Sequence, residues 1–480
     1  MSRKAFAFSF ADRYVGLVVH TLSAMIIARL LSPPEIGVYS LTMVLVTFIA
    51  TFRDLGAGMY LVQKKELTTS DVRDTWAVQL GLGLLFALLI ASASMPVAAF
   101  YREPRMMDIM LVLALNFALT PFQGLPYAWL MRAMRFDVLA SMRITAALVQ
   151  AACGVGLAWQ GIGPISLAWA NLAATVAGAT FAIAIVGREL PWKPRFAGVR
   201  HVVSFGGRIT GITFLNTIRN ASPELFLGKL QGMTDTGLFS RGQGLVAMFE
   251  RLIMDAVNAV ALPMFANEIR EGREITASFL RAVALLTALG WSFLAFLGIL
   301  AFPVIRVLYG TQWDDAVDPT RWLAAAMAIT VPAHICLAPL VATGEIRAVF
   351  RVALLSMLVA VMCAGAGAYL GLLPLCQLMV PAAIVSSGLW LRAAQRHVIF
   401  PWPAILRTFA GSACLAIAAA AVPLTVAMFF GWRSTDIIVT LAIAVPGSAA
   451  GLLGVAYFMK HPVWEEVRRA ITQAAALLRR

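Results

Sequence analysis

The chain has 480 residues, of which 60% are hydrophobic and only 13% are charged, and its formal net charge is +14. Soluble domains usually carry about a quarter charged residues, so this composition excludes an ordinary soluble enzyme and indicates a polytopic membrane protein. The positive charge does not indicate nucleic-acid binding, because the cations recur between apolar runs and do not gather on one face or in one tail.

Apolar runs fill almost the whole chain, and each is near the roughly 20 residues that cross a bilayer. About fourteen are expected, at residues 10–31, 36–61, 76–100, 106–131, 138–160, 163–187, 202–227, 236–262, 276–308, 321–343, 348–371, 374–396, 404–430 and 435–458. We therefore predict an all-α polytopic membrane protein, because lipid admits only helices or closed barrels.

The loops between these runs alternate between cation-poor and cation-rich. Cation-rich loops hold, for example, Lys64 and Lys65, then Arg132, then Arg188, whereas the intervening loops hold few net positive charges. Because cationic loops stay in the cytoplasm, the even number of spans places both termini there.

Two short segments recur in the same order. The pattern S-F-x-x-R-x-x-G occurs at residues 9–16 and 204–211, and a Gly-centred pattern at 35–40 returns at 235–240. Both copies begin on the cytoplasmic side and hold six spans, which predicts two parallel lobes. We expect an N-terminal lobe at 1–190, a C-terminal lobe at 191–400, two added helices at 401–459 and an amphipathic cytoplasmic tail at 460–480.

Charged side chains inside the spans are the candidate functional residues. Each costs about 2.5–3.5 kcal/mol to insert, so it is expected to face a watery cavity or a partner. The candidate substrate-binding residues are Arg13, Arg53, Arg208, Arg219, Arg251, Asn216 and Asn220. The candidate coupling or ion-pair residues are Asp54, Glu224, Glu250 and Asp255. Arginines at several depths suit an anion that travels, such as a pyrophosphate, because guanidinium binds phosphate bidentately.

Helical spacing places some of these residues together. Arg208 and Arg219 are about three turns apart on one face, which Asn216 and Asn220 continue. In the next span, Arg251, Asp255 and Asn258 form a similar stripe. The second repeat has five more residues between its two motifs than the first, which predicts a kink or bulge near residues 216–223.

A competing interpretation gives these charges a structural role. Arg53 would pair with Asp54, and Arg251 with Glu250 or Asp255. Arg13, Arg208 and Arg241 would extend to the lipid headgroups.

Motifs for bound cofactors are missing from the sequence. It has no phosphate-binding loop and no HExxH, and its five cysteines are isolated in apolar runs. We therefore expect no cofactor, no metal site and no catalytic residue.

Two segments carry a family resemblance. Residues 28–40 (ARLLSPPEIGVYS) resemble the link between the first two helices of bacterial polysaccharide transporters, and residues 52–58 (FRDLGAG) resemble the end of their second helix. The family is that of Wzx-type oligosaccharide flippases, in the multidrug/oligosaccharidyl-lipid/polysaccharide exporter superfamily.

This resemblance implies a function. It is the flipping of an undecaprenyl-pyrophosphate-linked oligosaccharide across the bacterial inner membrane, from the cytoplasmic to the periplasmic leaflet, for O-antigen, capsule or exopolysaccharide synthesis. The implied partners are that lipid, membrane lipids, and the polymerase and glycosyltransferases of the same pathway, with no nucleic acid. The family's cationic cavity helices hold Arg13, Arg53, Arg219 and Arg251 here.

Two other functions stay open. A cation-coupled multidrug antiporter of the same superfamily would need a mid-membrane acidic site, for which Asp54 and Asp255 are candidates. A membrane glycosyltransferase or polymerase would need paired carboxylates in an outer loop, where only Asp314, Asp315 and Asp318 cluster.

Overall fold

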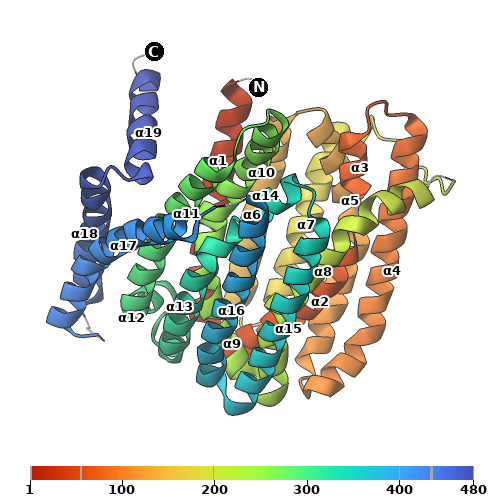
Figure 1. The fold of residues 1–480 in the computed structure, drawn as a ribbon. Coiled ribbons are helices and arrows are strands. Elements are labelled where there is room, and N and C mark those ends of the chain that lie inside the picture. The colour runs from red at the N-terminus through yellow and green to blue at the C-terminus, as the bar shows by residue number, and fades with distance from the viewer. Residues whose placement is uncertain (1–2, 54–56, 198, 399, 433–435, 479–480) are drawn as a thin grey trace. The chain divides into compact units, whose positions relative to one another are not determined.

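The computed structural model describes residues 3–53, 57–197, 199–398, 400–432 and 436–478. Within these ranges it does not describe the side chains of 3–14, 52–53, 199–210, 212, 252, 255–256, 258–260, 470 and 473–478. The described chain is helical and contains no strand (Figure 1). Eleven of its helices are long and apolar enough to cross a membrane, which confirms the predicted all-α membrane protein.

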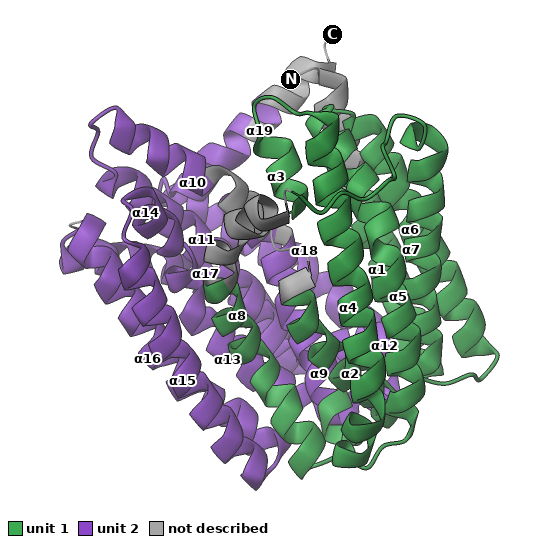
Figure 2. Cartoon of the chain, turned by 90° about the vertical axis from the view of Figure 1, so that its right-hand side faces the viewer, with its two compact units in different colours: residues 1–237 green, residues 238–480 purple. Residues whose placement is uncertain are grey.

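Two compact units divide the chain, residues 1–237 (unit 1) and 238–480 (unit 2) (Figure 2). Unit 1 holds α1 (Arg3–Leu30), α2 (Pro33–Arg53), α3 (Ala57–Gln63), α4 (Thr69–Tyr101), α5 (Arg105–Arg132), α6 (Phe136–Trp159), α7 (Ile165–Val186), α8 (Val199–Leu230) and the start of α9 (Met233–Phe249).

Unit 2 continues the chain with a larger number of short helical segments. It holds the rest of α9, the π-helical η1 (Glu250–Met254), α10 (Asp255–Arg270), α11 (Thr276–Ile299), α12 (Ala301–Tyr309), the 3₁₀-helical η2 (Thr311–Ala316), α13 (Val317–His334), α14 (Leu337–Ala342), α15 (Ile346–Leu370), α16 (Leu372–Val398), α17 (Trp402–Phe430), α18 (Ile437–Phe458) and α19 (Pro462–Leu478).

All fourteen expected apolar runs fall on helical segments, but several are broken. Run 36–61 forms α2 and α3, run 236–262 forms α9, η1 and most of α10, and run 276–308 forms α11 and α12. The count of fourteen membrane crossings is not confirmed, because eleven segments meet the length and apolarity criterion. The helices that miss it include α8, whose sequence carries the candidate charges Arg208, Arg219 and Glu224.

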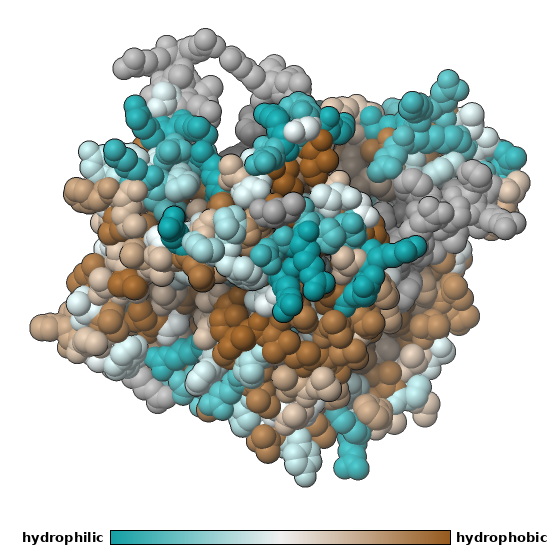
Figure 3. Space-filling model, in the orientation of Figure 1, coloured by the Kyte–Doolittle hydropathy of each residue, from teal (hydrophilic) through white to brown (hydrophobic). Residues whose placement is uncertain are grey.

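Large apolar side chains on the surface show where lipid must lie. Phe429, Phe458 and Ile438 at the ends of α17 and α18 are 80–84% exposed. Figure 3 shows broad apolar areas on the face that it presents. A water-soluble protein rarely exposes such areas, so hydrocarbon is their natural solvent.

The core of unit 1 forms where α2, α4 and α5 meet. The start of α4 is fixed by a capping box, in which the Asp71 N–H and carboxylate exchange hydrogen bonds with the Thr68 side chain and N–H. Along the helices, Leu41, Ile90 and Ile109 are fully buried in one apolar cluster. This packing gives unit 1 a rigid core on which α2 and α8 carry polar residues.

Glycines allow the ends of α2 and α9 to touch. A Cβ added at Gly37 would collide with the Met233 carbonyl, and one at Gly237 would collide with the Pro33 carbonyl. Each glycine thus packs on the backbone four residues before the other glycine. The two contacts are related by the 200-residue offset of the repeat, so the structure pairs the two copies of this motif reciprocally.

In unit 2, α17 and α18 use the same device. Gly447 and Gly451 form a G-x-x-x-G pattern whose added Cβ atoms would collide with Val422 and the Ala418 carbonyl of α17. Small residues at this spacing let helix backbones approach closely in lipid, where no hydrophobic effect drives helices together.

We predict that Gly37→Ala destabilises the folded protein by about 1–3 kcal/mol, because the new methyl group must push the α9 backbone away. Gly81→Ala is the matched control, since a Cβ there meets nothing within 4 Å. The control should be neutral or stabilising, as alanine is preferred to glycine inside helices. Thermal unfolding in detergent measures both, and equal midpoints for the two variants would contradict the predicted contact.

Candidate functional site

The candidate site begins at the seam between α2 and α8 in unit 1. The Oγ1 atoms of Thr51 and Thr217 lie 3.3 Å apart, and the Phe48 and Phe214 rings contact edge to face with centroids 6.3 Å apart. Nearer the other end of the seam, Ser40 contacts Glu224. The two helices therefore run antiparallel, which brings the last turn of α2 beside the middle of α8.

Glu224 is the best-defined polar residue of this seam. Its side chain is only 8% exposed, and Oε2 accepts a hydrogen bond of 2.5 Å from Ser40 Oγ. No ion pair is recorded for this carboxyl among the described residues. Burying a carboxylate beside a hydroxyl and away from any cation costs free energy. The hydrogen bond from Ser40 offsets part of this cost, so Glu224 is a polar contact that holds α2 against α8.

Three further candidates of α8 surround the threonine contact. Asn216 and Arg219 are partly buried and Asn220 is exposed, and Arg219 Nε donates to Asn220 Oδ1 over 3.4 Å. Arg53 ends α2 two residues after Thr51, so its backbone approaches the same part of the seam. The side chains of Arg13, Arg53 and Arg208 lie outside the described residues, as does Asp54 entirely.

The remaining candidates belong to unit 2, on and beside η1. Glu250 Oε1 lies 3.3 Å from His334 Nε2, whose Nδ1 lies 2.8 Å from the Thr330 carbonyl. His334 is thus a satisfied helix histidine. Arg251 is exposed, and the side chain of Asp255 is not among the described ones.

Two geometric expectations concern the backbone of these helices. Where a kink or bulge was expected, at residues 216–223, α8 has no break: it is α-helical from Val199 to Leu230, with Pro223 inside it. The five extra residues lengthen α8 after Arg208, compared with α1 after Arg13. A π-helical turn occurs in η1, so the 3.6-residue spacing assumed for the stripe of Arg251, Asp255 and Asn258 does not hold over Glu250–Met254, and the stripe stays a prediction.

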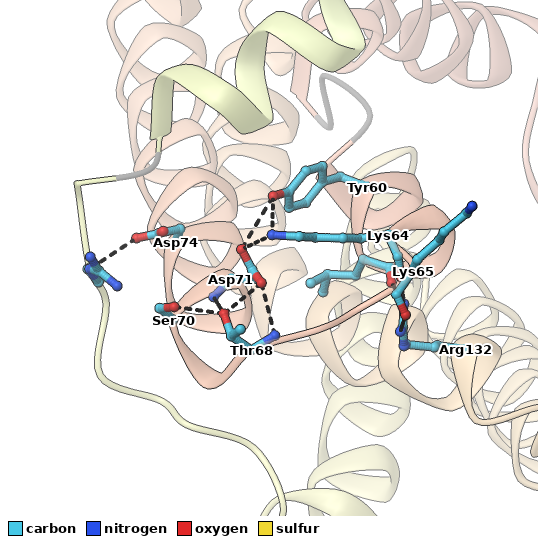
Figure 4. A network of polar contacts seen from close by, with 10 residues as sticks. Tyr60, Lys64, Lys65, Thr68, Ser70, Asp71, Asp74 and Arg132 are labelled. Atoms are coloured by element: carbon cyan, nitrogen blue, oxygen red, sulfur yellow. Dashed lines mark hydrogen bonds and ion pairs between the residues drawn. The ribbon is translucent and has the colours of Figure 1, made fainter.

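A polar network fixes the basic loop before α4 (Figure 4). Lys64 Nζ donates to Asp71 Oδ1 over 2.5 Å, and Tyr60 OH lies 3.4 Å from the same oxygen. The hydrogen bond to Asp71, and then that to Tyr60, raise the pKa of the Lys64 ammonium. Arg132 donates to the carbonyls of Leu61 and Lys64 over 2.6 Å each. These cations hold the loop, so they are structural in unit 1.

The segment between α7 and α8 is hydrogen-bonded to the start of α4, at the same end of unit 1. Arg195 donates its backbone N–H to the Arg73 carbonyl, and Arg73 Nε donates to the Lys193 carbonyl. The Trp192 ring packs edge to face on Trp76 with centroids 5.1 Å apart. The sequence used these loop cations only to predict which side of the membrane each loop occupies. The structure shows that several of them also hold the loops in place by hydrogen bonds.

The acidic loop raised for a membrane enzyme is engaged in ion pairs. Asp314 receives two hydrogen bonds from Arg306, at 2.9 and 2.6 Å, and Asp318 lies 3.0 Å from Arg321. Among the described residues no cluster of three metal-ligating side chains occurs. Asp314 and Asp318 thus stabilise the local structure of this loop.

Several contacts escaped the sequence-based prediction. Ser40 and Glu224 are 184 residues apart, so no local spacing points to their pairing. The π-helical turn has no signature in residue type. The repeat motif carries one signal of this packing. It aligns Gly37 with Gly237, and these are the two glycines that pack reciprocally in the structure.

Sequence comparison relates the chain to polysaccharide biosynthesis. Residues 26–318 match the model of a family described as polysaccharide biosynthesis protein. The succinoglycan biosynthesis transport protein ExoT of Rhizobium meliloti (strain 1021) is 25% identical over 348 residues, covering 72% of this chain and 69% of that protein. The lipopolysaccharide biosynthesis protein WzxC of Escherichia coli (strain K12) is 18% identical over 316 residues, covering 64% and 62%.

Structural comparison extends the likeness to nearly the whole fold. The lipid II flippase MurJ, in an inward closed conformation, matches with a TM-score of 0.75 at 11% identity, covering 95% of this chain and 100% of that one. An inward-facing MATE multidrug transporter of the MOP superfamily matches with a TM-score of 0.65 at 14% identity, covering 82% and 96%. These matches confirm the fold expected from the sequence.

We predict that Ser40→Ala destabilises unit 1 by about 1–3 kcal/mol, because it leaves the buried Glu224 carboxyl without its donor. Ser92→Ala is the control, as this α4 hydroxyl makes only an exposed bond to its own helix backbone. Thermal unfolding of the purified variants measures the difference. If Ser40→Ala unfolds at the same temperature as Ser92→Ala, the Ser40–Glu224 contact does not support the seam.

Proposed function

Because the chain belongs to the polysaccharide biosynthesis protein family, we propose that it flips an undecaprenyl-pyrophosphate-linked oligosaccharide across the bacterial inner membrane. The family match over residues 26–318 carries this proposal. The relatives ExoT and WzxC are described as a succinoglycan transport protein and a lipopolysaccharide biosynthesis protein, which supports a polysaccharide precursor as the cargo. The matched stretch is 62–69% of the length of these two relatives.

The proposed direction is from the cytoplasmic to the periplasmic leaflet, with both termini in the cytoplasm. The alternation of cation-rich loops supports this orientation. An anionic head that leaves the negative cytoplasm gains about 2.3 kcal/mol per charge per 100 mV of membrane potential, so the potential itself favours export. The proposed partners are the polymerase and glycosyltransferases of the same pathway.

In the proposed mechanism the polar head crosses along helices that carry arginine while the lipid tail stays in the hydrocarbon. In unit 1, Arg219 and Asn220 lie beside the α2–α8 seam, where Arg53 also ends α2. In unit 2, Arg251 lies exposed on η1. Guanidinium groups suit the phosphate oxygens of such a head because they offer paired N–H donors in one plane.

We predict that Arg219→Ala and Arg251→Ala each slow flipping at least about tenfold, the size expected for losing one charge-assisted contact in the transition state. The assay uses liposomes that contain the protein and a labelled undecaprenyl-pyrophosphate-linked oligosaccharide, and follows exposure of the sugar on the opposite leaflet. Arg219→Lys and Arg251→Lys should retain more activity than the alanine variants, because they keep the charge.

Arg105→Ala is the matched control, since Arg105 is an exposed arginine already paired with Glu103 at 2.7 Å in the loop after α4. Flipping by the wild type that survives both alanine variants would keep the function and reject these two residues. Absence of flipping by the wild type, together with cation-driven efflux that Asp54→Asn or Asp255→Asn abolishes, would establish the antiporter instead.

A further inference from the structure

Three arginines of unit 2 lie over aromatic rings near the loop that joins α12 to α13. Arg306 lies 4.6 Å from the Phe302 ring centroid, Arg321 lies 5.6 Å from that of Trp432, and Arg241 lies 5.4 Å from that of Tyr309. Arg321 Nη2 is buried without a hydrogen-bond partner, but Arg306 and Arg321 each contact a carboxylate, that of Asp314 and that of Asp318 respectively. Arg241 is the exception.

Arg241 comes from α9 and has two rings against it but no anion. Besides Tyr309, the Trp313 ring centroid lies 5.6 Å from its guanidinium carbon. Its Nε is shielded from solvent and makes no hydrogen bond, and no ion pair to Arg241 occurs among the described residues. A buried guanidinium donor without an acceptor has lost its hydration without gaining a hydrogen bond, so the site is incomplete as it stands.

The surrounding aromatic residues hold the guanidinium of Arg241 by its face and supply no acceptor for its Nε–H donor. Trp313 is fully buried and Tyr309 is 7% exposed, and their rings contact each other with centroids 6.2 Å apart. Gly310 follows Tyr309 with a φ of +96°, a conformation that glycine adopts without strain, and this turn directs η2 back toward α9. A ring contact satisfies the face of a guanidinium, whereas its N–H donors lie in its plane.

A second positive charge acts on the same place. The charges of Arg241 and Arg251 both act on the Tyr309 hydroxyl, so this phenol lies in the field of two arginines. Arg241 is on α9 and Arg251 is on η1, with the helix distorted between Glu250 and Met254. The two guanidinium groups offer only N–H donors and positive charge, and the phenol can add an O–H donor, a combination that favours a multiply charged oxyanion over a cation.

We propose that Arg241, held by Tyr309 and Trp313, is an anion site in unit 2 that binds the phosphate or diphosphate group of a lipid. The identity of that lipid rests on the proposed function. The site itself is inferred from the guanidinium of Arg241, whose Nε has no acceptor. The diphosphate would supply the acceptor oxygens that Asp314 supplies to Arg306 and that Asp318 supplies to Arg321. Arg241, which the competing interpretation of the sequence assigned to the lipid headgroups, would then be a binding residue.

The test is a titration of the purified protein with inorganic pyrophosphate, followed by tryptophan fluorescence. Trp313 is in contact range of Arg241, so binding there should change its emission. The chain has 12 tryptophans, so the signal is taken as the difference between the wild type and Trp313→Phe. We expect a saturable change in the wild type, and a dissociation constant raised at least about tenfold in Arg241→Gln.

Arg306→Gln is the matched control, because this neighbouring arginine is already occupied by Asp314 and should leave pyrophosphate binding unchanged. Lack of a fluorescence change in the wild type, or a change that persists in Arg241→Gln, would overturn the site. Thermal unfolding checks that Arg241→Gln is folded, and Arg241→Lys should restore part of the affinity by returning the charge.

Two lipid sources are separated by the bilayer used. In nanodiscs, weaker pyrophosphate binding when phosphatidylglycerol replaces phosphatidylcholine assigns the site to anionic headgroups, and unchanged binding assigns it to the diphosphate of the cargo. The flipping assay is read separately. If the wild type flips and Arg241→Gln flips equally well, the site has no part in transport, whereas a wild type that does not flip refutes the proposed function and leaves the pyrophosphate result to decide on the site.

Discussion

An uncompensated charge is costly in hydrocarbon, and this constraint decides what each ionic residue of the molecule can do. Several described charges near helix ends are compensated: Lys64 by Asp71, Arg306 by Asp314, and Arg281 of α11 by Glu465 and Glu466 of α19. Such pairs anchor loops and helix ends. Glu224 and Arg241 differ, because the first has only a hydroxyl and the second has only aromatic rings. Compensation by a neighbour therefore separates structural charges from those available to a ligand or to a conformational change.

Fold class could be predicted from the sequence because a run of about 20 apolar residues has essentially one stable structure in lipid. Breaks within runs could not, since α11 and α12 differ from one long helix only by an irregular turn at Leu300 that packing determines. The candidate residues were found by the cost of placing them in a span. Their grouping was only partly accessible, because the seam of Ser40 and Glu224 depends on contacts across the fold, and the roles of Arg13, Arg53, Arg208 and Arg251 stay predictions.

The boundary between the two units differs from the boundary that the sequence repeat predicts. The repeat predicted lobes that meet near residue 190, which remains a proposal, whereas contacts divide the chain at Gly237. The difference arises because α8 packs along α2 through Thr217, Phe214 and Glu224. The segment that precedes α8 is also fastened to α4 through Arg73 and Arg195. The first helix of the second repeat therefore belongs by its contacts to the first unit.

The π-helical turn at Glu250–Met254 has an evolutionary consequence. Such a turn accommodates one residue more than an α-helix of the same length, so inserting a single residue into a regular helix would produce it. Removing one residue would restore the regular ladder and rotate everything after it by about 100°. Every side chain of α10 would then turn to a new neighbour without any substitution. Insertion or deletion at this point is thus a short mutational route by which descendants of this chain could present different residues to different cargo.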